Sequence, residues 1–237
     1  MPDGCYGRLC YYENTALDRR HIIKLIRDAF LKRHYVKIFV FDFFDSFSND
    51  IGFEIHPCTT TLVDISRPDW VPPDKKLQSQ IRKAEREGVH IQIFDWTQHH
   101  RKFLELMKAT EKRHDRAPRY NTRFFRSLAE LACRDNRIQW IWCEHHGHPV
   151  CSHIYFIENK TLQGWQMYFD KSFSYLKPNQ FVRFKMCRQA ARQGVSRLNM
   201  GETPPGAEGL AYYKKRWGGK PYHYRCYVMK RGLGKYL

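Results

Sequence analysis

The feature that most constrains the fold is a series of patterns between residues 162 and 227. An apolar and aromatic run over residues 162–169 predicts a strand, and a polar loop follows it. Pro178 opens a helical pattern that stops at Gly194, because proline is tolerated in the first helical turn and glycine ends helices well. A short apolar run over residues 196–201, a second helical stretch and an alternating strand complete the series. A strand, a helix and a neighbouring strand in this order predict a crossover unit with a parallel strand pair.

The loop before Pro178 follows the first strand of this unit, and it therefore lies at the carboxyl end of that strand. Open α/β sheets bind ligands at this end of their strands. Backbone N–H groups at the start of a helix also favour an anion there. The helix has an apolar stripe that includes Phe181 and Phe184, and a basic stripe formed by Lys185, Arg188 and Arg192.

Five motifs in a fixed order carry a family resemblance. They are Tyr168-Phe-Asp170, Leu176-Lys-Pro-Asn179, a helix ending in Gly194, Leu198-Asn-Met-Gly201 and Tyr213-Lys-Lys-Arg-Trp-Gly-Gly219. Their order and spacing resemble the Fem-type peptidyltransferases. Upstream, residues 61–66 and the basic helix over residues 77–89 extend the resemblance, which covers roughly residues 61–227.

The resemblance implies an α/β fold, with a GNAT-like mixed central sheet flanked by helices. It also implies an enzyme that moves an aminoacyl group from a charged tRNA to an amine. Fem-type enzymes contain two GNAT-like halves. Here residues 1–66 resemble only the latter part of a first half, and residues 67–237 resemble a complete acyltransferase domain. A partner chain or an oligomer that completes the first half is therefore one expectation, and no helical arm is predicted.

Charge and cysteine usage indicate the setting of the chain. Lys and Arg exceed Asp and Glu by 17 charges, which favours contact with polyanions such as RNA. The eight cysteines form no Cys-x-x-Cys pair, no apolar run could span a bilayer, and the first residues do not resemble a signal peptide. We therefore expect reduced thiols in a cytoplasmic protein without a membrane span.

One cluster contains residue types that bind zinc. Residues 143–151 read Cys-Glu-His-His-Gly-His-Pro-Val-Cys, but this spacing matches no standard zinc site. Strand patterns flank the cluster, and Gly147 and Pro149 are typical of a turn. We therefore expect a hairpin tip and no metal. Further helices are predicted over residues 17–31, 101–113 and 121–132, where Asn121 or Thr122 could be the cap, and a strand over residues 36–44.

Aminolysis of an acyl carbonyl needs a neutral amine, stabilisation of a carbonyl oxyanion and a route for protons. In the Fem-type pattern a lysine before the Gly-Gly turn neutralises charge near the reacting centre, and Lys214 matches it here. Asn199 stands where the family usually has an aspartate, and it can orient a substrate but cannot act as a base. Glu202 is then the nearest carboxylate. We expect Lys214→Met to keep the fold and to slow the reaction.

Other residues are expected to bind substrate or RNA. The substrate-binding candidates are Gln166, Tyr168, Lys177, Asn179 and Tyr213, together with Arg116 and Arg119, which the family resemblance places on the acceptor side. The RNA-binding candidates are Lys83, Arg183, Lys185, Lys215 and Arg216. For the basic helix over residues 77–89, a solvated charged face is an equally good interpretation.

Three alternatives for the function stay open. The loop over residues 173–179 contains no glycine, whereas close backbone approach to the pyrophosphate of an acyl-CoA normally relies on glycines. An aminoacyl-tRNA co-substrate without a further cofactor is therefore the preferred alternative, and a donor that is an acyl-CoA or an acyl carrier protein is the second. A third alternative is a non-catalytic RNA- or protein-binding module on a GNAT scaffold, because the first half is short and Asn199 replaces an acid.

Overall fold

The structure is a computed structural model that describes residues 24, 25, 27, 28, 32, 37–42 and 53–230, with no side-chain detail at 37, 38 and 42. The chain divides into two compact units, one of Met1–Thr60 with Pro221–Leu237 and one of Thr61–Lys220. The division expected after residue 66 stays a prediction. None of the described helices is long and apolar enough to cross a membrane.

The first unit contains strand β1 (Lys37–Asp42), which pairs antiparallel with β8 (Lys220–Lys230). The strand predicted over residues 36–44 is thus confirmed within its described residues. Strand β2 (Glu54–Asp64) begins in this unit and continues into the second. The helix predicted over residues 17–31 lies largely outside the described residues.

The second unit is built on a mixed sheet with the strand order β2-β7-β6-β5-β4-β3. The strands are β3 (Val89–Ile93), β4 (Ile138–His145), β5 (His148–Glu158), β6 (Thr161–Phe169) and β7 (Arg197–Asn199). Strands β3 to β6 pair antiparallel in sequence order, and β6 pairs parallel with β7. The predicted crossover unit and its parallel pair are therefore confirmed, and the fold is of the α/β, GNAT-like class.

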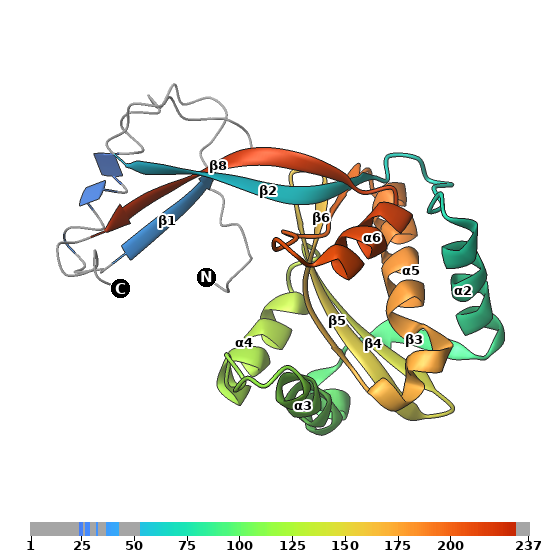
Figure 1. Ribbon diagram of the computed structural model, residues 1–237. Helices are drawn as coiled ribbons and strands as arrows, with labels where there is room; N and C mark the ends of the chain where they lie inside the picture. The colour runs from blue at the N-terminus through green and yellow to red at the C-terminus, as the bar shows by residue number, and fades with distance from the viewer. Residues whose placement is uncertain (1–23, 26, 29–31, 33–36, 43–52, 231–237) are drawn as a thin grey trace. The chain divides into compact units, whose positions relative to one another are not determined.

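Helices cover both faces of this sheet (Figure 1). Helices α2 (Lys75–Arg86) and α5 (Pro178–Arg192) pack on one face, and α3 (Trp96–Arg113) and α4 (Thr122–Ala132) pack on the other. Two apolar clusters fill the two layers: one contains Leu77, Val182 and Trp217, and the other is built around Phe103 and Trp140. Both faces of β5 are therefore buried, which explains why its sequence does not alternate between apolar and polar residues.

The helix ends follow local chemistry that the sequence contains. The side chain of Asn121 accepts a hydrogen bond from the N–H of Phe124 and caps the N-terminus of α4. Of the two predicted caps, Asn121 rather than Thr122 is therefore the one used. Pro178 occupies the first turn of α5, and Gly194 follows this helix with a φ of 81°. Between β6 and α5 the predicted loop contains a 3₁₀ helix, η1 (Lys171–Leu176).

Candidate functional site

Strands β6 and β7 pair over three residues and then separate. The last pair joins Gln163 to Asn199. Beyond it, β6 continues to Phe169 along β5, whereas Gly201 accepts a hydrogen bond from the N–H of Thr61 at 3.0 Å. The sheet therefore opens between the carboxyl ends of a parallel strand pair, which is where open α/β sheets bind ligands. The parallel pair predicted from the sequence thus separates after three paired residues.

Helix α6 (Glu208–Arg216) places Lys214 against the segment that follows β7. Lys214 Nζ donates to the carbonyl oxygens of Gly201 and Glu202, each at 2.8 Å, and to Thr203 Oγ1 at 2.9 Å. The residue is only 3% exposed. An ammonium group has three N–H donors, and all three are used here. In this structure Lys214 can therefore act on a substrate only through the groups that it holds.

Opposing effects act on the pKa of Lys214. Burial lowers the pKa of Lys214 to about 8, the nearby Arg183 cation lowers it as well, and Glu202 raises it. The three oxygen acceptors also favour the charged ammonium. Lys214 is therefore protonated at pH 7 and loses its proton within a pH range that is accessible to experiment.

Asn199 and Glu202 differ in their surroundings. Asn199 is buried, and its Oδ1 accepts a hydrogen bond from the N–H of Gly201 at 2.8 Å. Asn199 thus shapes the turn after β7. Glu202 is exposed, and its backbone carbonyl rather than its carboxylate holds Lys214.

A second buried cation lies on α5. Arg183 is 6% exposed, and its Nη1 donates to the hydroxyl of Tyr213 at 2.5 Å. Its Nη2 donates to Met167 Sδ on β6 at 3.0 Å, and its guanidinium lies over the ring of Trp217. A guanidinium group can only donate. The hydroxyl of Tyr213 must therefore accept from Arg183 and direct its own proton elsewhere.

Arg183 also starts a chain of buried hydrogen bonds. It hydrogen-bonds Tyr155, whose hydroxyl lies 3.0 Å from His153 Nδ1. His153 Nε2 lies 2.8 Å from Asn179 Oδ1 in the first turn of α5. Burial raises the pKa of Tyr155 and lowers the pKa of His153 to about 3, so both groups are neutral. Because Asn179 Oδ1 can only accept, the neutral His153 carries its proton on Nε2, and its Nδ1 accepts from the Tyr155 hydroxyl.

This direction of hydrogen bonding fixes the amide of Asn179. Its Oδ1 accepts from His153, so its NH₂ group points away from the imidazole as a donor. His153 and Tyr155 were not predicted as site residues. A histidine within an apolar strand pattern was only a weak sequence signal for a functional site. The groups that His153 and Tyr155 contact become evident only from the packing of α5 on β5.

The start of α5 offers few backbone donors to an anion. Pro178 has no N–H, and the N–H groups of Gln180 and Phe181 both donate to the carbonyl of Lys177, at 3.1 and 3.3 Å. Lys177 has a φ of 58°, a left-handed conformation that glycine adopts more readily. Three of the first four residues of α5 therefore offer no unbonded backbone N–H, and the anion site expected at this helix start stays a prediction.

The remaining substrate-binding candidates lie on the face of the sheet covered by α3 and α4. Tyr168 is 2% exposed and packs edge-on against Phe103, and burial followed by the charge of Glu111 raises its pKa. The side chain of Gln166 points to the same face of β6 as that of Tyr168, because residues two apart in a strand share a face. Arg116 pairs with Glu111, and Arg119 is exposed. The structure thus places Tyr168 on the opposite face of the sheet from Asn179 and Tyr213.

The RNA-binding candidates have different surroundings. Lys215 is exposed, whereas Arg216 donates to Asp74 Oδ1 at 3.1 Å and to Gln80. Lys185 pairs with Glu85 at 2.6 Å. Arg183 is buried, as described above, so phosphate cannot reach it in this structure. Lys83 lies near the ring of Tyr175. The expectation that Arg183 contacts RNA is therefore corrected, because its guanidinium serves the protein interior.

The predicted hairpin is formed by β4 and β5, with Gly147 at a φ of 75°. Cys143 and Cys151 face each other across these strands and are buried. Within residues 53–230 and the short described stretches before them, no three His, Cys, Asp or Glu side chains are grouped to hold a metal ion.

Comparisons with known proteins agree with this architecture. The chain shares its fold with the crystal structure of FemX, at a TM-score of 0.68 and 13% identity over 92% of this chain and 79% of FemX. It also resembles the C-terminal domain of a putative lysylphosphatidylglycerol synthetase from Agrobacterium fabrum, at a TM-score of 0.65 and 12% identity over 92% and 76% of the two chains. L-PGS from Bacillus licheniformis matches at a TM-score of 0.62 and 13% identity over 92% and 75%.

No curated protein matches the chain in sequence. Residues 74–215 match the family model described as the acetyltransferase (GNAT) domain. This match covers more than half of the 237 residues and includes the open strand pair, α5 and Lys214. The chain therefore belongs to the acetyltransferase (GNAT) domain family.

Proposed function

We propose that this protein is an N-acyltransferase that moves an aminoacyl group from aminoacyl-tRNA to an amine by direct aminolysis. The observation that carries the proposal is the opening between β6 and β7, beside which two hydroxyl groups are each held by a buried cation. Thr203 accepts from Lys214, and Tyr213 accepts from Arg183. Because both oxygens accept from cations, both O–H groups are polarised donors that point away from those cations.

Such donors suit the charge that develops in this reaction. The amine nitrogen attacks the ester carbonyl carbon, and negative charge builds on the carbonyl oxygen. A C–N bond then forms, the bond from carbon to the ribose oxygen breaks, and the amine proton leaves while the ribose oxygen gains one. In this proposal Thr203 and Tyr213 stabilise the oxyanion, Lys214 and Arg183 act through them, and Glu202 accepts the amine proton. Asn199 positions the turn that holds these groups.

The donor is inferred from the start of α5. An acyl-CoA would place its pyrophosphate on backbone N–H groups there. In this chain Pro178 lacks the group, and Gln180 and Phe181 already donate to Lys177. These contacts support aminoacyl-tRNA over acyl-CoA. The acceptor amine, carried by a peptide or a small molecule, would approach from the Tyr168 face of the sheet, where Arg116 and Arg119 lie.

A single-turnover assay with tRNA charged with a radiolabelled amino acid tests the proposal. The protein is mixed with the charged tRNA and a panel of amines, and amide formation is followed by mass spectrometry. We expect the aminoacyl ester to be consumed faster with protein and amine than with either alone. The double variant Tyr213→Phe/Thr203→Val should be slower by about 10²–10³-fold, because it removes both proposed oxyanion donors.

The assay also separates the alternatives. Acyl transfer from acyl-CoA, with no consumption of charged tRNA, would replace the proposed donor. Tight binding of charged tRNA without consumption of the ester for any amine would favour a binding module instead.

A further inference from the structure

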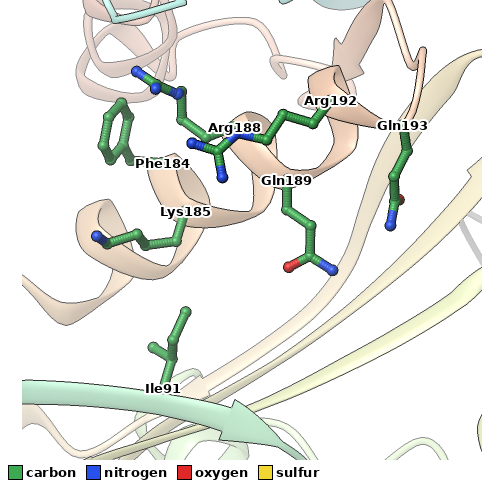
Figure 2. Close-up of a pocket in the computed structure, with 7 residues that line it drawn as sticks. All are labelled: Ile91, Phe184, Lys185, Arg188, Gln189, Arg192 and Gln193. Carbon is green, nitrogen blue, oxygen red and sulfur yellow. The ribbon is translucent and has the colours of Figure 1, made fainter. Parts of the chain in front are cut away.

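The outer face of α5 forms one side of a hollow of about 580 Å³. Ile91 of β3 lies on the opposite side, and Phe184 together with five polar residues of α5 and its C-terminal cap lines the rest (Figure 2). These five are Lys185, Arg188, Gln189, Arg192 and Gln193. Their spacing of three and four residues places them on one face of the helix. We call this feature the α5 basic hollow.

The cations of the α5 basic hollow are poorly neutralised by the protein. Lys185 pairs with Glu85, whose side chain is 56% exposed, so this ion pair is weak. Arg188 contacts the backbone carbonyl of Asp69 at 3.4 Å, and its Nε is buried without a hydrogen-bond partner. Throughout the described part of the chain, no carboxylate lies within ion-pair distance of Arg188 or Arg192.

Helix stability alone does not explain this arrangement. A cation in the last turn of a helix interacts favourably with the helix dipole, which accounts for Arg192. Lys185 and Arg188 lie before that turn, where like charges at spacings of three and four residues destabilise a helix. In Figure 2 the side chain of Arg192 extends back along α5 toward Arg188 and Gln189. An anion in the hollow would relieve this repulsion.

We infer that the α5 basic hollow binds backbone phosphates of RNA, and specifically of the tRNA that carries the acyl donor. The inference rests on the proposed function. From Asn179, in the first turn of α5, to Arg188 the helix rises about 14 Å, at about 1.5 Å per residue. A ligand that joins the reacting centre to the hollow must therefore be long and carry phosphates along its length. Phosphate contacts of Arg and Lys position nucleic acids in this manner.

Fluorescence anisotropy with a labelled, uncharged tRNA transcript tests the inference. The double variant Arg188→Gln/Arg192→Gln is compared with Arg101→Gln/Arg123→Gln, which removes the same charge from exposed arginines of α3 and α4. We expect the hollow variant to bind about tenfold more weakly. Its slope of log affinity against log salt should fall by about 2, because each lost phosphate contact lowers the slope by about 1. The control should lose much less.

Arg192 makes no described contact that holds the fold, so the single variant Arg192→Gln provides a second test if Arg188→Gln unfolds the protein. Equal weakening by the hollow and control variants would overturn the inference. Displacement of the tRNA by coenzyme A at a similar concentration would assign the hollow to a small phosphate ligand and would also overturn it. If the hollow variant binds tRNA weakly as expected but the wild type never transfers an aminoacyl group, the RNA site stands and the proposed function fails.

Discussion

Lys214 Nζ lies 2.8 Å from the carbonyl oxygen of Gly201, and the same oxygen accepts the N–H of Thr61 at 3.0 Å. One carbonyl thus joins helix α6 to strand β2 next to the open strand pair. Both lone pairs of this oxygen are occupied, so it cannot accept a bond from a substrate. Lys214 is therefore a structural cation for the turn after β7 as well as a source of positive potential for the site.

Lys214→Met should affect both stability and turnover. The substitution removes the Lys214 donor from three oxygen acceptors, of which the Gly201 carbonyl keeps the N–H of Thr61. Each buried polar group left unsatisfied costs about 1–3 kcal/mol. The burial of Lys214 therefore changes the expectation that this variant keeps the wild-type stability: we now expect a lower melting temperature and a rate about 10²–10³-fold lower. Lys215→Met is the matched control, because Lys215 is exposed on the same helix. An unchanged rate in a folded Lys214→Met protein would remove this residue from the mechanism.

The pH dependence should show the titration of Lys214. Its pKa of about 8 lies below the ordinary lysine value of 10.5, because burial disfavours the charge. As the pH rises through about 8, the cation behind Thr203 is lost, and turnover that depends on it should fall. Stability should change in the opposite direction: between pH 8 and 10.5 the unfolded chain binds more protons than the folded one, so the free energy of unfolding rises with pH.

The measurement for this prediction is the ¹³Cε shift of lysine in labelled protein, followed with pH beside the transfer rate. One lysine signal should titrate near pH 8 and should be missing from Lys214→Met. A rate that falls near pH 8 in that variant as well would show that another group controls the profile.

Tyr155→Phe should reverse the tautomer of His153. The wild-type hydroxyl donates to Nδ1 and thereby places the imidazole proton on Nε2, where it binds Asn179 Oδ1. Without that donor, Nδ1 can carry the proton, and the Asn179 amide can turn its NH₂ group toward Nε2. Long-range ¹H–¹⁵N spectra distinguish the two tautomers directly. Tyr168→Phe removes a buried hydroxyl from the neighbouring strand and should leave the His153 spectrum unchanged.

Gly219→Ala should destabilise the fold severely. A Cβ at this position would lie 2.5 Å from Thr61 Cγ2 and 2.7 Å from the carbonyl oxygen of Lys214. The second contact is with backbone, so Thr61→Ser should not restore stability. Gly209→Ala is the matched control in α6: its Cβ would meet nothing within 4 Å, and alanine favours a helix by about 1 kcal/mol. Thermal unfolding of the two proteins should therefore give shifts of opposite sign, and equal melting temperatures would contradict the prediction.

The local chemistry of the sequence was sufficient to predict most of the helices and strands around the site. Pro178, Gly194 and Asn121 mark helix ends because their backbone or side-chain chemistry acts within a few residues. The parallel pair β6–β7 followed from the strand–helix–strand order, since crossover connections follow simple topological rules. The helix of residues 101–113 begins earlier, at Trp96, where Asp95 provides a cap that the apolar pattern did not show.

The roles of the charged residues depended on the tertiary structure. Arg183 and Lys185 are two positions apart on one helix, yet Arg183 is buried over Trp217 whereas Lys185 pairs with Glu85 at the surface. Similarly, Lys214 is buried and its neighbour Lys215 is exposed. The sequence by itself determined the helical periodicity and the excess of positive charge. Only the packing of α5 and α6 against the sheet decided which cations face the interior, because burial depends on contacts between segments far apart in the chain.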